Sequence, residues 1–276
     1  PYDVYLTTAN NLREPSSART PIKVAVTGAT TLADVQIWLD SANLASITKD
    51  GNNRVSQWND LSGQVRHFVQ PVAGNQPTYS ANGLGFMRTG IIIASNQWVY
   101  STVSTSLFNN VPGATIILVQ YMSGFSSTTL TNVSFQANAG STVNSRISVQ
   151  GIHNGTIARV CVAGRRTDAD PFAAYAGGTI YSGDSHLYTA IYNFTANKVY
   201  AHINGGEEVV NNTFQAAGGN TSATDSPTNY IGANPGLFGA RYLFSGAVSE
   251  VIVYRRAITA GERALIESYL KGKWGL

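Results

Sequence analysis

Short apolar runs, separated by clusters of Gly, Asn, Ser and Thr, make up most of the chain. This spacing predicts β-strands joined by turns rather than long helices. The run 114–122 is almost continuously apolar and rich in β-branched residues, so we expect it to lie centrally with both faces covered. Two pairs of runs flank short polar turns and predict β-hairpins: 145–150 with 157–162, and 187–194 with 198–203.

A tight turn is predicted after the second hairpin. Asn204-Gly205 suits a turn that requires positive φ at both central residues, and it leads into a strand over 207–210. Antiparallel strands in this abundance predict an all-β fold, in which two sheets pack as a sandwich with protected edges.

The most convincing helix closes the chain. Thr259 precedes Glu262 by three residues, which predicts a capping box at the start of the helix. An apolar stripe follows and predicts that the helix lies against a sheet: Leu265, Ile266, Tyr269 and Leu270.

Composition favours one large β domain. The chain has 276 residues, of which 43% are hydrophobic and only 12% are charged, so it can bury a substantial core. The lone Cys161 lies in an apolar run and is expected to be a buried thiol, which excludes a disulfide framework. The sequence has no secretory signal and no apolar run long enough to span a bilayer, so we expect no membrane partner.

The charge of the chain is mildly basic. The formal net charge is +3, and the basic pairs Arg165-Arg166, Arg255-Arg256 and Lys271 with Lys273 are small and far apart. We interpret them as solvated faces and expect no nucleic-acid partner. An acidic partner for Arg165-Arg166 is the alternative.

Residues 1–34 differ from the rest of the chain. They are largely polar, and 22–26 (Ile-Lys-Val-Ala-Val) is their only strand-like run. A polar segment of this length cannot bury enough apolar surface to order itself. Three interpretations stay open: a flexible terminus, an arm that orders against a neighbouring subunit, or a strand added to the main domain.

Two blocks of sequence carry a resemblance to a known family. Trp38-Leu-Asp-Ser-Ala-Asn-Leu, followed by Val55-Ser-Gln-Trp-Asn-Asp-Leu-Ser-Gly63, is similar to the opening of the bacterial and bacteriophage branch of the concanavalin A-like, laminin-G-type jelly rolls. The segment from Tyr230 through Arg263 resembles the end of such domains. The resemblance implies one laminin-G-like jelly roll over 35–276, with 1–34 as an N-terminal arm or added strand. It implies nothing about the ligand.

Catalytic residues are not indicated. The wider superfamily includes glucanases that place two carboxylates on one strand, where acid and nucleophile lie close together. Here Glu250 stands alone in an apolar strand, and the adjacent Glu207 and Glu208 point to opposite faces of theirs. No Gly-x-Ser-x-Gly motif occurs, and the four histidines are dispersed. We therefore expect a protein that is not an enzyme.

Candidate binding residues lie around 168–181. Asp168-Ala-Asp170 offers alternating carboxylates in a loop, which suits either a solvated turn or a calcium ion, although no cofactor is required. Tyr175 and Tyr181 flank a Gly-Gly turn, and flat rings beside polar groups can stack on sugar faces. The predicted carbohydrate-binding residues are Asp168, Asp170, Tyr175 and Tyr181.

Two functions remain after these exclusions. The first is a structural protein of a bacteriophage virion, a capsid decoration or tail-associated protein located on the virion surface. It would be homo-oligomeric or lattice-bound, would meet capsid or tail proteins through residues 1–34, and would adhere to cell-surface glycans through many weak contacts. The alternative is a free-standing extracellular lectin or adhesion module.

Overall fold

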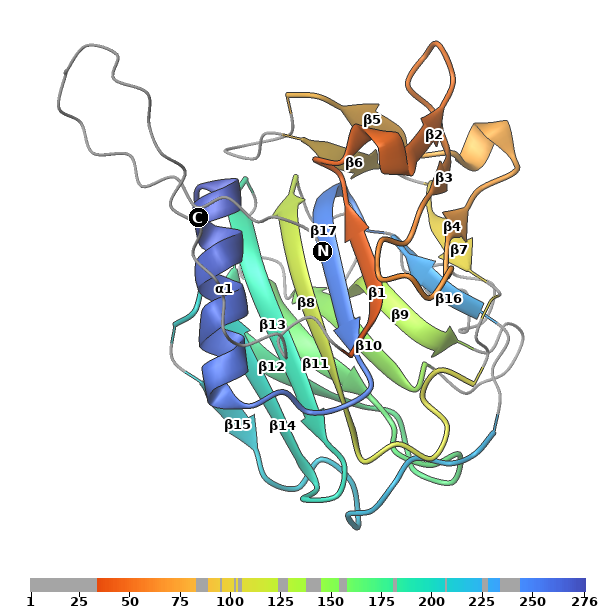
Figure 1. Ribbon diagram of the computed structural model, residues 1–276. Coiled ribbons are helices and arrows are strands. Elements are labelled where there is room, and N and C mark those ends of the chain that lie inside the picture. The colour runs from red at the N-terminus through yellow and green to blue at the C-terminus, as the bar shows by residue number, and fades with distance from the viewer. Residues whose placement is uncertain are drawn as a thin grey trace, which may run out of the picture.

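The protein folds as an antiparallel β-sandwich with a C-terminal helix (Figure 1), which confirms the all-β prediction. The computed structural model describes residues 34–82, 89–94, 96–101, 103, 106–123, 129–137, 145–153, 158–180, 183–206, 208–224, 228–233 and 244–276. The predicted arm lies outside the described residues, apart from Asp34. No helix in the described part combines the length and apolar character needed to cross a membrane.

The first sheet holds the central strand that the sequence predicted. Within the described chain its order is β15 (Val209–Asn211), β14 (Lys198–Ile203), β13 (Ser185–Asn193), β8 (Gly113–Met122), β17 (Gly246–Tyr254), β6 (Gly90–Ile93) and β5 (Thr78–Ser80), and β1 (Val35–Asp40) also pairs with β17. Strand β8 lies between β13 and β17, and all its residues but Tyr121 are buried. Its continuous apolar run is therefore explained by cover on both faces.

The second sheet packs face to face against the first. Its order over the described residues is β12 (Ala173–Ile180), β11 (Ala158–Gly164), β10 (Ile147–His153), β9 (Thr129–Ala137), β16 (Thr228–Ile231), β7 (Val99–Ser101), β4 (Phe68–Val69), β3 (Val55–Trp58) and β2 (Ile47–Lys49). Two short 3₁₀ turns lie in connecting loops, Leu44–Ser46 between β1 and β2 and Ala73–Asn75 between β4 and β5.

Both predicted hairpins are present, β10 with β11 and β13 with β14. The turn after β14 is also as expected. Asn204 and Gly205 have φ values of +52° and +68°, a left-handed conformation that Asn and Gly tolerate, and the chain then pairs β15 with β14.

The main hydrophobic core lies between the two sheets. Large buried rings from both sheets fill it, among them Trp58, Phe68, Phe135, Tyr188 and Tyr192. Cys161 is buried as predicted, and burial raises the pKa of its thiol to about 12.

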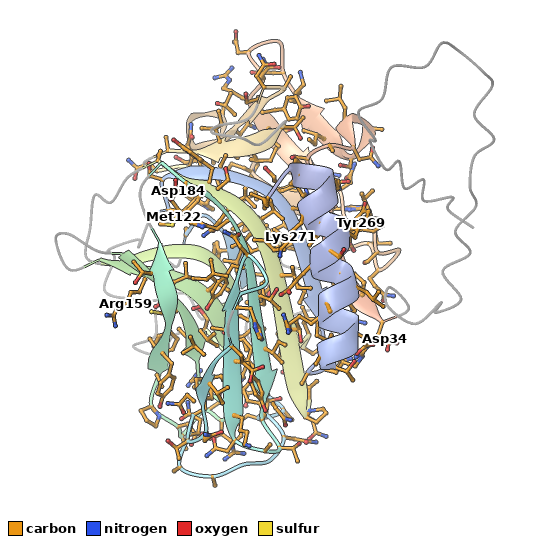
Figure 2. The ribbon with its side chains drawn as sticks, turned by 90° about the vertical axis from the view of Figure 1, so that its left-hand side faces the viewer. Asp34, Met122, Arg159, Asp184, Tyr269 and Lys271 are labelled. Carbon is orange, nitrogen blue, oxygen red and sulfur yellow. The ribbon has the colours of Figure 1, made fainter. Side chains whose placement is uncertain are left out.

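The closing helix α1 (Ala260–Trp274) covers the outer face of the first sheet, away from the second sheet (Figure 2). The predicted capping box is present, with the Thr259 hydroxyl accepting from the Glu262 N–H at 3.2 Å. The predicted apolar stripe is wrong at Leu265, whose exposure is 61%. The stripe is confirmed at Ile266, Tyr269 and Leu270, which pack against the sheet. Trp274 extends this contact face, which follows every third or fourth residue.

The opening block forms a loop around one carboxylate. Asp60 Oδ1 accepts hydrogen bonds from the backbone N–H groups of Trp38 and Ser62, each at 2.9 Å. Its Oδ2 accepts from the Ser62 hydroxyl at 2.7 Å and from the Arg66 N–H at 3.0 Å. The aspartate of this block therefore ties the loop after β3 to strand β1.

Candidate glycan-binding surfaces

The predicted aspartates lie in the loop between β11 and β12, where arginines neutralise them. Asp168 Oδ1 is 2.8 Å from Arg146 Nη2 and 3.4 Å from Arg165 Nη2. Burial by itself would raise the pKa of Asp168, but hydrogen bonds from Thr224 and Arg146 outweigh it and lower that pKa. A calcium ion here would have to displace guanidinium groups. Over the described residues, no cluster of three or more His, Cys, Asp or Glu side chains could hold a metal ion.

Asp170 closes the same loop. Its Oδ2 accepts hydrogen bonds from the Thr167 backbone N–H and hydroxyl, at 2.8 and 2.7 Å, and lies 3.7 Å from Arg166 Nη2. The prediction that Arg165-Arg166 forms a solvated face is therefore wrong, since the Arg165 side chain is only 5% exposed. The pair is held inside the loop because the two aspartates pair with it.

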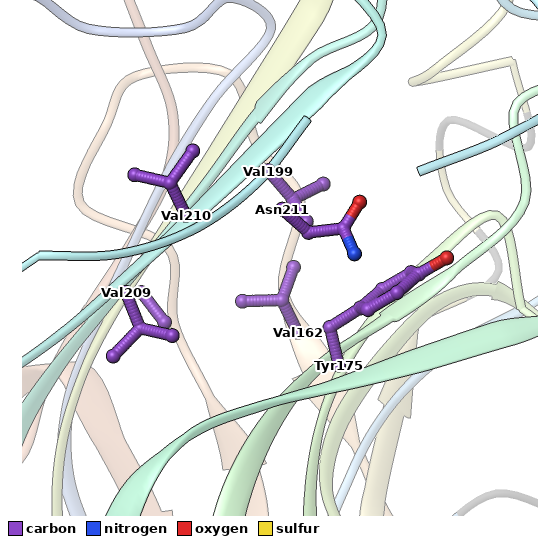
Figure 3. A pocket seen from close by; sticks show the side chains of 7 residues that line it. Val162, Tyr175, Val199, Val209, Val210 and Asn211 are labelled. Carbon is purple, nitrogen blue, oxygen red and sulfur yellow. The ribbon is translucent and has the colours of Figure 1, made fainter. Parts of the chain in front are cut away.

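Tyr175 lies on β12, in a small cleft at the edge of the sandwich (Figure 3). Its ring packs against Phe214 at a centroid distance of 5.6 Å, and its hydroxyl lies 3.3 Å from the carbonyl oxygens of Thr213 and Phe214. The cleft has a volume of about 210 Å³ and is lined by Val162, Tyr175, Val199, Ala201, Val209, Val210 and Asn211. It is mainly aliphatic, which suits an apolar side chain better than a sugar.

Tyr181 lies outside the described residues. The remaining predicted residues do not form one site, since the two aspartates point into ion pairs within their loop and Tyr175 points into the cleft. The prediction of a carbohydrate site at these four residues stays a prediction.

A pair of tyrosines on the outer face of the second sheet was missed by the sequence analysis. Tyr100 of β7 lies directly opposite Tyr230 of β16, with ring centroids 6.2 Å apart and planes tilted by 40°. Both side chains are half-buried. Their neighbours Val99 and Ile231 point the other way, into the core, so the alternation of the strands places both tyrosines on the face away from the first sheet.

The same row continues across two further strands. Val69 of β4 is opposite Tyr100, and Gln57 of β3 is opposite Val69; both are half-buried. From Tyr230 to Gln57 the row crosses three strand spacings, or about 14 Å. It contains no charged side chain. The Gln57 amide donates to Asn59 Oδ1 at 2.6 Å, which leaves the Gln57 carbonyl oxygen as an acceptor.

Alternation around Tyr100 and Tyr230 is visible in the sequence, yet it spans only three or four residues in each strand. The pairing of two strands so distant in the chain is a tertiary property. No local signal could therefore have joined these two tyrosines.

Two carboxylates on neighbouring strands lie together beneath the helix. Glu250 is the sole acid of β17, as the sequence suggested, but Asp40 of the neighbouring strand β1 lies directly opposite it. Lys273 Nζ is 2.7 Å from both carboxylates. The indole N–H groups of Trp38 and Trp274 donate to Glu250 at 2.8 and 2.6 Å. Glu250 is 1% exposed, and burial raises its pKa.

Comparisons with known proteins rest on the fold alone. No family model and no curated protein matches the sequence. Among solved structures, the binding domain of Paraclostridial Mosquitocidal Protein 1 superposes with a TM-score of 0.59 and 13% identity, covering 87% of this chain and 53% of that one. The botulinum neurotoxin serotype D ligand binding domain, in complex with N-acetylneuraminic acid, has a TM-score of 0.53 and 11% identity, covering 86% of this chain and 51% of that one.

One solved domain matches over nearly its full length. Domain 4 of AbnA, a GH43 extracellular arabinanase from Geobacillus stearothermophilus in complex with arabinotriose, has a TM-score of 0.52 and 12% identity, covering 83% of this chain and 96% of that domain. This chain spans only 33% of Trypanosoma rangeli sialidase, another similar structure. These likenesses support the lectin-like β-sandwich of jelly-roll type.

Proposed function

We propose that the protein is a non-catalytic glycan-binding module whose ligand lies on the outer face of the second sheet. The observation that carries the proposal is the Tyr100–Tyr230 pair, which offers two adjacent aromatic rings on a sheet face. Aromatic rings with polar tips bind ligands that have both apolar faces and hydroxyl groups, as sugars do. The uncharged row favours a neutral sugar over an anionic polymer.

Two features support a role without catalysis. The carboxylates Asp40 and Glu250 share one lysine under the helix, so neither is available to donate or accept a proton at a glycosidic bond. Two of the similar structures are binding domains of toxins. Binding by a sandwich of this type is therefore the simplest function for the chain.

The setting that we propose is the surface of a bacteriophage virion, as a capsid decoration or tail-associated protein held through residues 1–34. This setting rests on the sequence resemblance and on the composition of the arm. A free-standing extracellular lectin is the alternative. Co-sedimentation of the protein with phage particles stripped of it distinguishes the virion setting from the free-standing lectin. Full-length protein should rebind and protein lacking 1–34 should not, and failure of both would exclude the virion setting.

Glycan binding is tested directly on an array of neutral and acidic sugars that includes arabinotriose and N-acetylneuraminic acid. Tyr100→Ala and Tyr230→Ala should each weaken binding by at least about tenfold, the loss of one stacking contact of about 1.4 kcal/mol. Asp168→Asn and Tyr175→Phe serve as matched controls and should bind like the wild type. The proposed face is wrong if the controls lose binding and the Tyr100 and Tyr230 variants keep it, and the function is wrong if the folded wild type binds no glycan.

A further inference from the structure

The strand β15 forms an exposed edge of the first sheet. Over the described residues it pairs only with β14. Val209 and Val210 of β15 are 43% and 38% exposed, although both are large apolar side chains. An edge strand of this kind, with unpaired backbone groups and exposed apolar side chains, is a template for pairing with another strand.

The cleft of Figure 3 lies directly beside this edge. Val209 and Asn211 are opposite Ala201 and Val199 of β14, so they face the cleft. Asn211 Oδ1 accepts from the Thr213 N–H at 2.8 Å, which holds the end of the strand in place. At Ala201, which lines the cleft, the two sheets approach each other closely. A Cβ on Gly177 of β12 would lie 2.5 Å from the Ala201 Cβ.

A segment of the same chain has the pattern that this cleft requires. In the run 22–26, Ile22, Val24 and Val26 alternate with Lys23 and Ala25. As a strand it would present three β-branched side chains on one face and a lysine on the other. Main-chain hydrogen bonds to β15 would hold it, and the alternate apolar side chains would fill the cleft.

Geometry favours delivery of this segment by a second copy. One row of paired residues crosses the first sheet from the start of β1 to β15: Val35, Tyr254, Thr115, Ile191, Tyr200 and Val210. Five strand spacings amount to about 24 Å. The nine residue-to-residue steps from Val26 to Val35 reach about 30 Å at full extension.

Residues 256–258 and helix α1 cover the straight path that the chain would follow along this row. Thr115 Oγ1 donates to the Arg256 carbonyl at 2.8 Å and accepts from the Ile258 N–H at 3.2 Å. Helix α1 then packs over the neighbouring apolar residues of the same face. A detour around the helix uses up the small surplus of length, so residues 22–26 cannot easily reach the edge of their own molecule.

We propose that residues 22–26 of one copy add as a strand to β15 of a second copy and insert their apolar side chains into its edge cleft. A reciprocal exchange closes a dimer, whereas a head-to-tail exchange builds a chain of subunits. This inference does not depend on glycan binding. It gives the arm a defined receptor on the protein itself.

The test uses full-length protein and two complementary variants. Val24→Asp places a charge in the donated strand, and Val209→Asp places one in the receiving cleft. Sedimentation equilibrium should show association of the wild type, and each variant alone should associate at least about tenfold more weakly. Val72→Asp is the matched control, because Val72 is exposed elsewhere at 56%, and it should associate like the wild type.

Mixing the two variants tells whether the arm binds to a second copy or to its own molecule. A Val209→Asp molecule keeps an intact arm and a Val24→Asp molecule keeps an intact cleft, so the mixture should form a one-to-one complex that neither variant forms alone. A monomeric wild type, or a mixture that stays monomeric, would overturn the proposal. If the wild type is monomeric and Val24→Asp lowers its melting temperature, the arm occupies its own molecule and the exchange is refuted.

Folding controls accompany the mixing experiment. Val209 is 43% exposed and lies on an edge strand, so Val209→Asp should keep the circular dichroism spectrum of the wild type. Glycan binding measured on the same samples is a separate readout, because the Tyr100–Tyr230 face lies on the other sheet. Loss of association with retained glycan binding therefore reports on the arm alone.

Discussion

Replacing Lys273 by Met tests whether the charged cluster under the helix anchors α1. The Lys273 ammonium lies 2.7 Å from both Asp40 Oδ2 and Glu250 Oε2. Burial by itself would lower the pKa of Lys273, but the two carboxylates outweigh it and raise that pKa, so the lysine is charged throughout the neutral range. Lys273→Met leaves two carboxylates together without a counter-ion.

The expected loss follows from the burial of the three groups. Removing one partner of a buried ion pair costs about 3–5 kcal/mol. The side chains of Lys273 and Asp40 keep 18% and 11% of their exposure, so water reaches part of the cluster. We therefore expect Lys273→Met to lower the free energy of unfolding by about 3 kcal/mol at neutral pH, the lower end of that range.

The loss should depend on pH in a defined direction. Without Lys273, burial and repulsion from the Asp40 carboxylate raise the pKa of Glu250 in the folded state further above its unfolded value. The folded variant then binds more protons than its unfolded state, so it gains stability relative to the wild type as the pH falls from about 7 to about 4. The deficit measured at neutral pH should therefore shrink in acid.

Urea denaturation followed by circular dichroism measures both effects. Lys271→Met is the matched control, since Lys271 lies on the same helix and should change stability by less than about 0.5 kcal/mol. A Lys273→Met loss below about 1 kcal/mol, or a loss that grows toward acid pH, would refute the reasoning.

Three further sets of changes test other parts of the fold. Glu262→Gln should lower the free energy of unfolding by about 1 kcal/mol at neutral pH, because a hydrogen bond from Arg256 lowers the pKa of Glu262 to about 2. In urea denaturation this loss should fade as the pH falls from about 4.5 to about 2, and a loss that persists at low pH would contradict the prediction. Gly177→Ala should destabilise the protein by about 2 kcal/mol, because the added methyl group clashes with the facing strand. Gly272→Ala in the helix has open space around it and should stabilise the protein by about 0.5–1 kcal/mol. Melting temperatures that shift in the same direction for both variants would be inconsistent with this. Val65→Asn should raise the melting temperature, because Val65 has a φ of +59° with 62% exposure and strain of about 1 kcal/mol is relieved without loss of burial; an unchanged or lower melting temperature would argue against strain.

Local patterns predicted most of the secondary structure. The hairpins, the Asn204-Gly205 turn and the capping box depend on residues close together in the chain, so their physical causes are visible in the sequence. The prediction that Leu265 is buried was wrong, because the side chains of the sheet decide how the helix is rotated on it. The prediction of a solvated face at Arg165-Arg166 was wrong for a similar reason, since ion pairs with two aspartates of the loop hold both arginines inward.

The chain by itself determined a β-sandwich with a capped closing helix, because period-two apolar alternation and turn residues act over a few neighbours. Only the tertiary structure decided which side chains meet. It placed Tyr100 against Tyr230, brought Asp40 and Glu250 to one lysine, and opened the cleft beside β15. Each of these contacts joins segments distant in sequence, and the free energy that selects them comes from the packing of whole sheets.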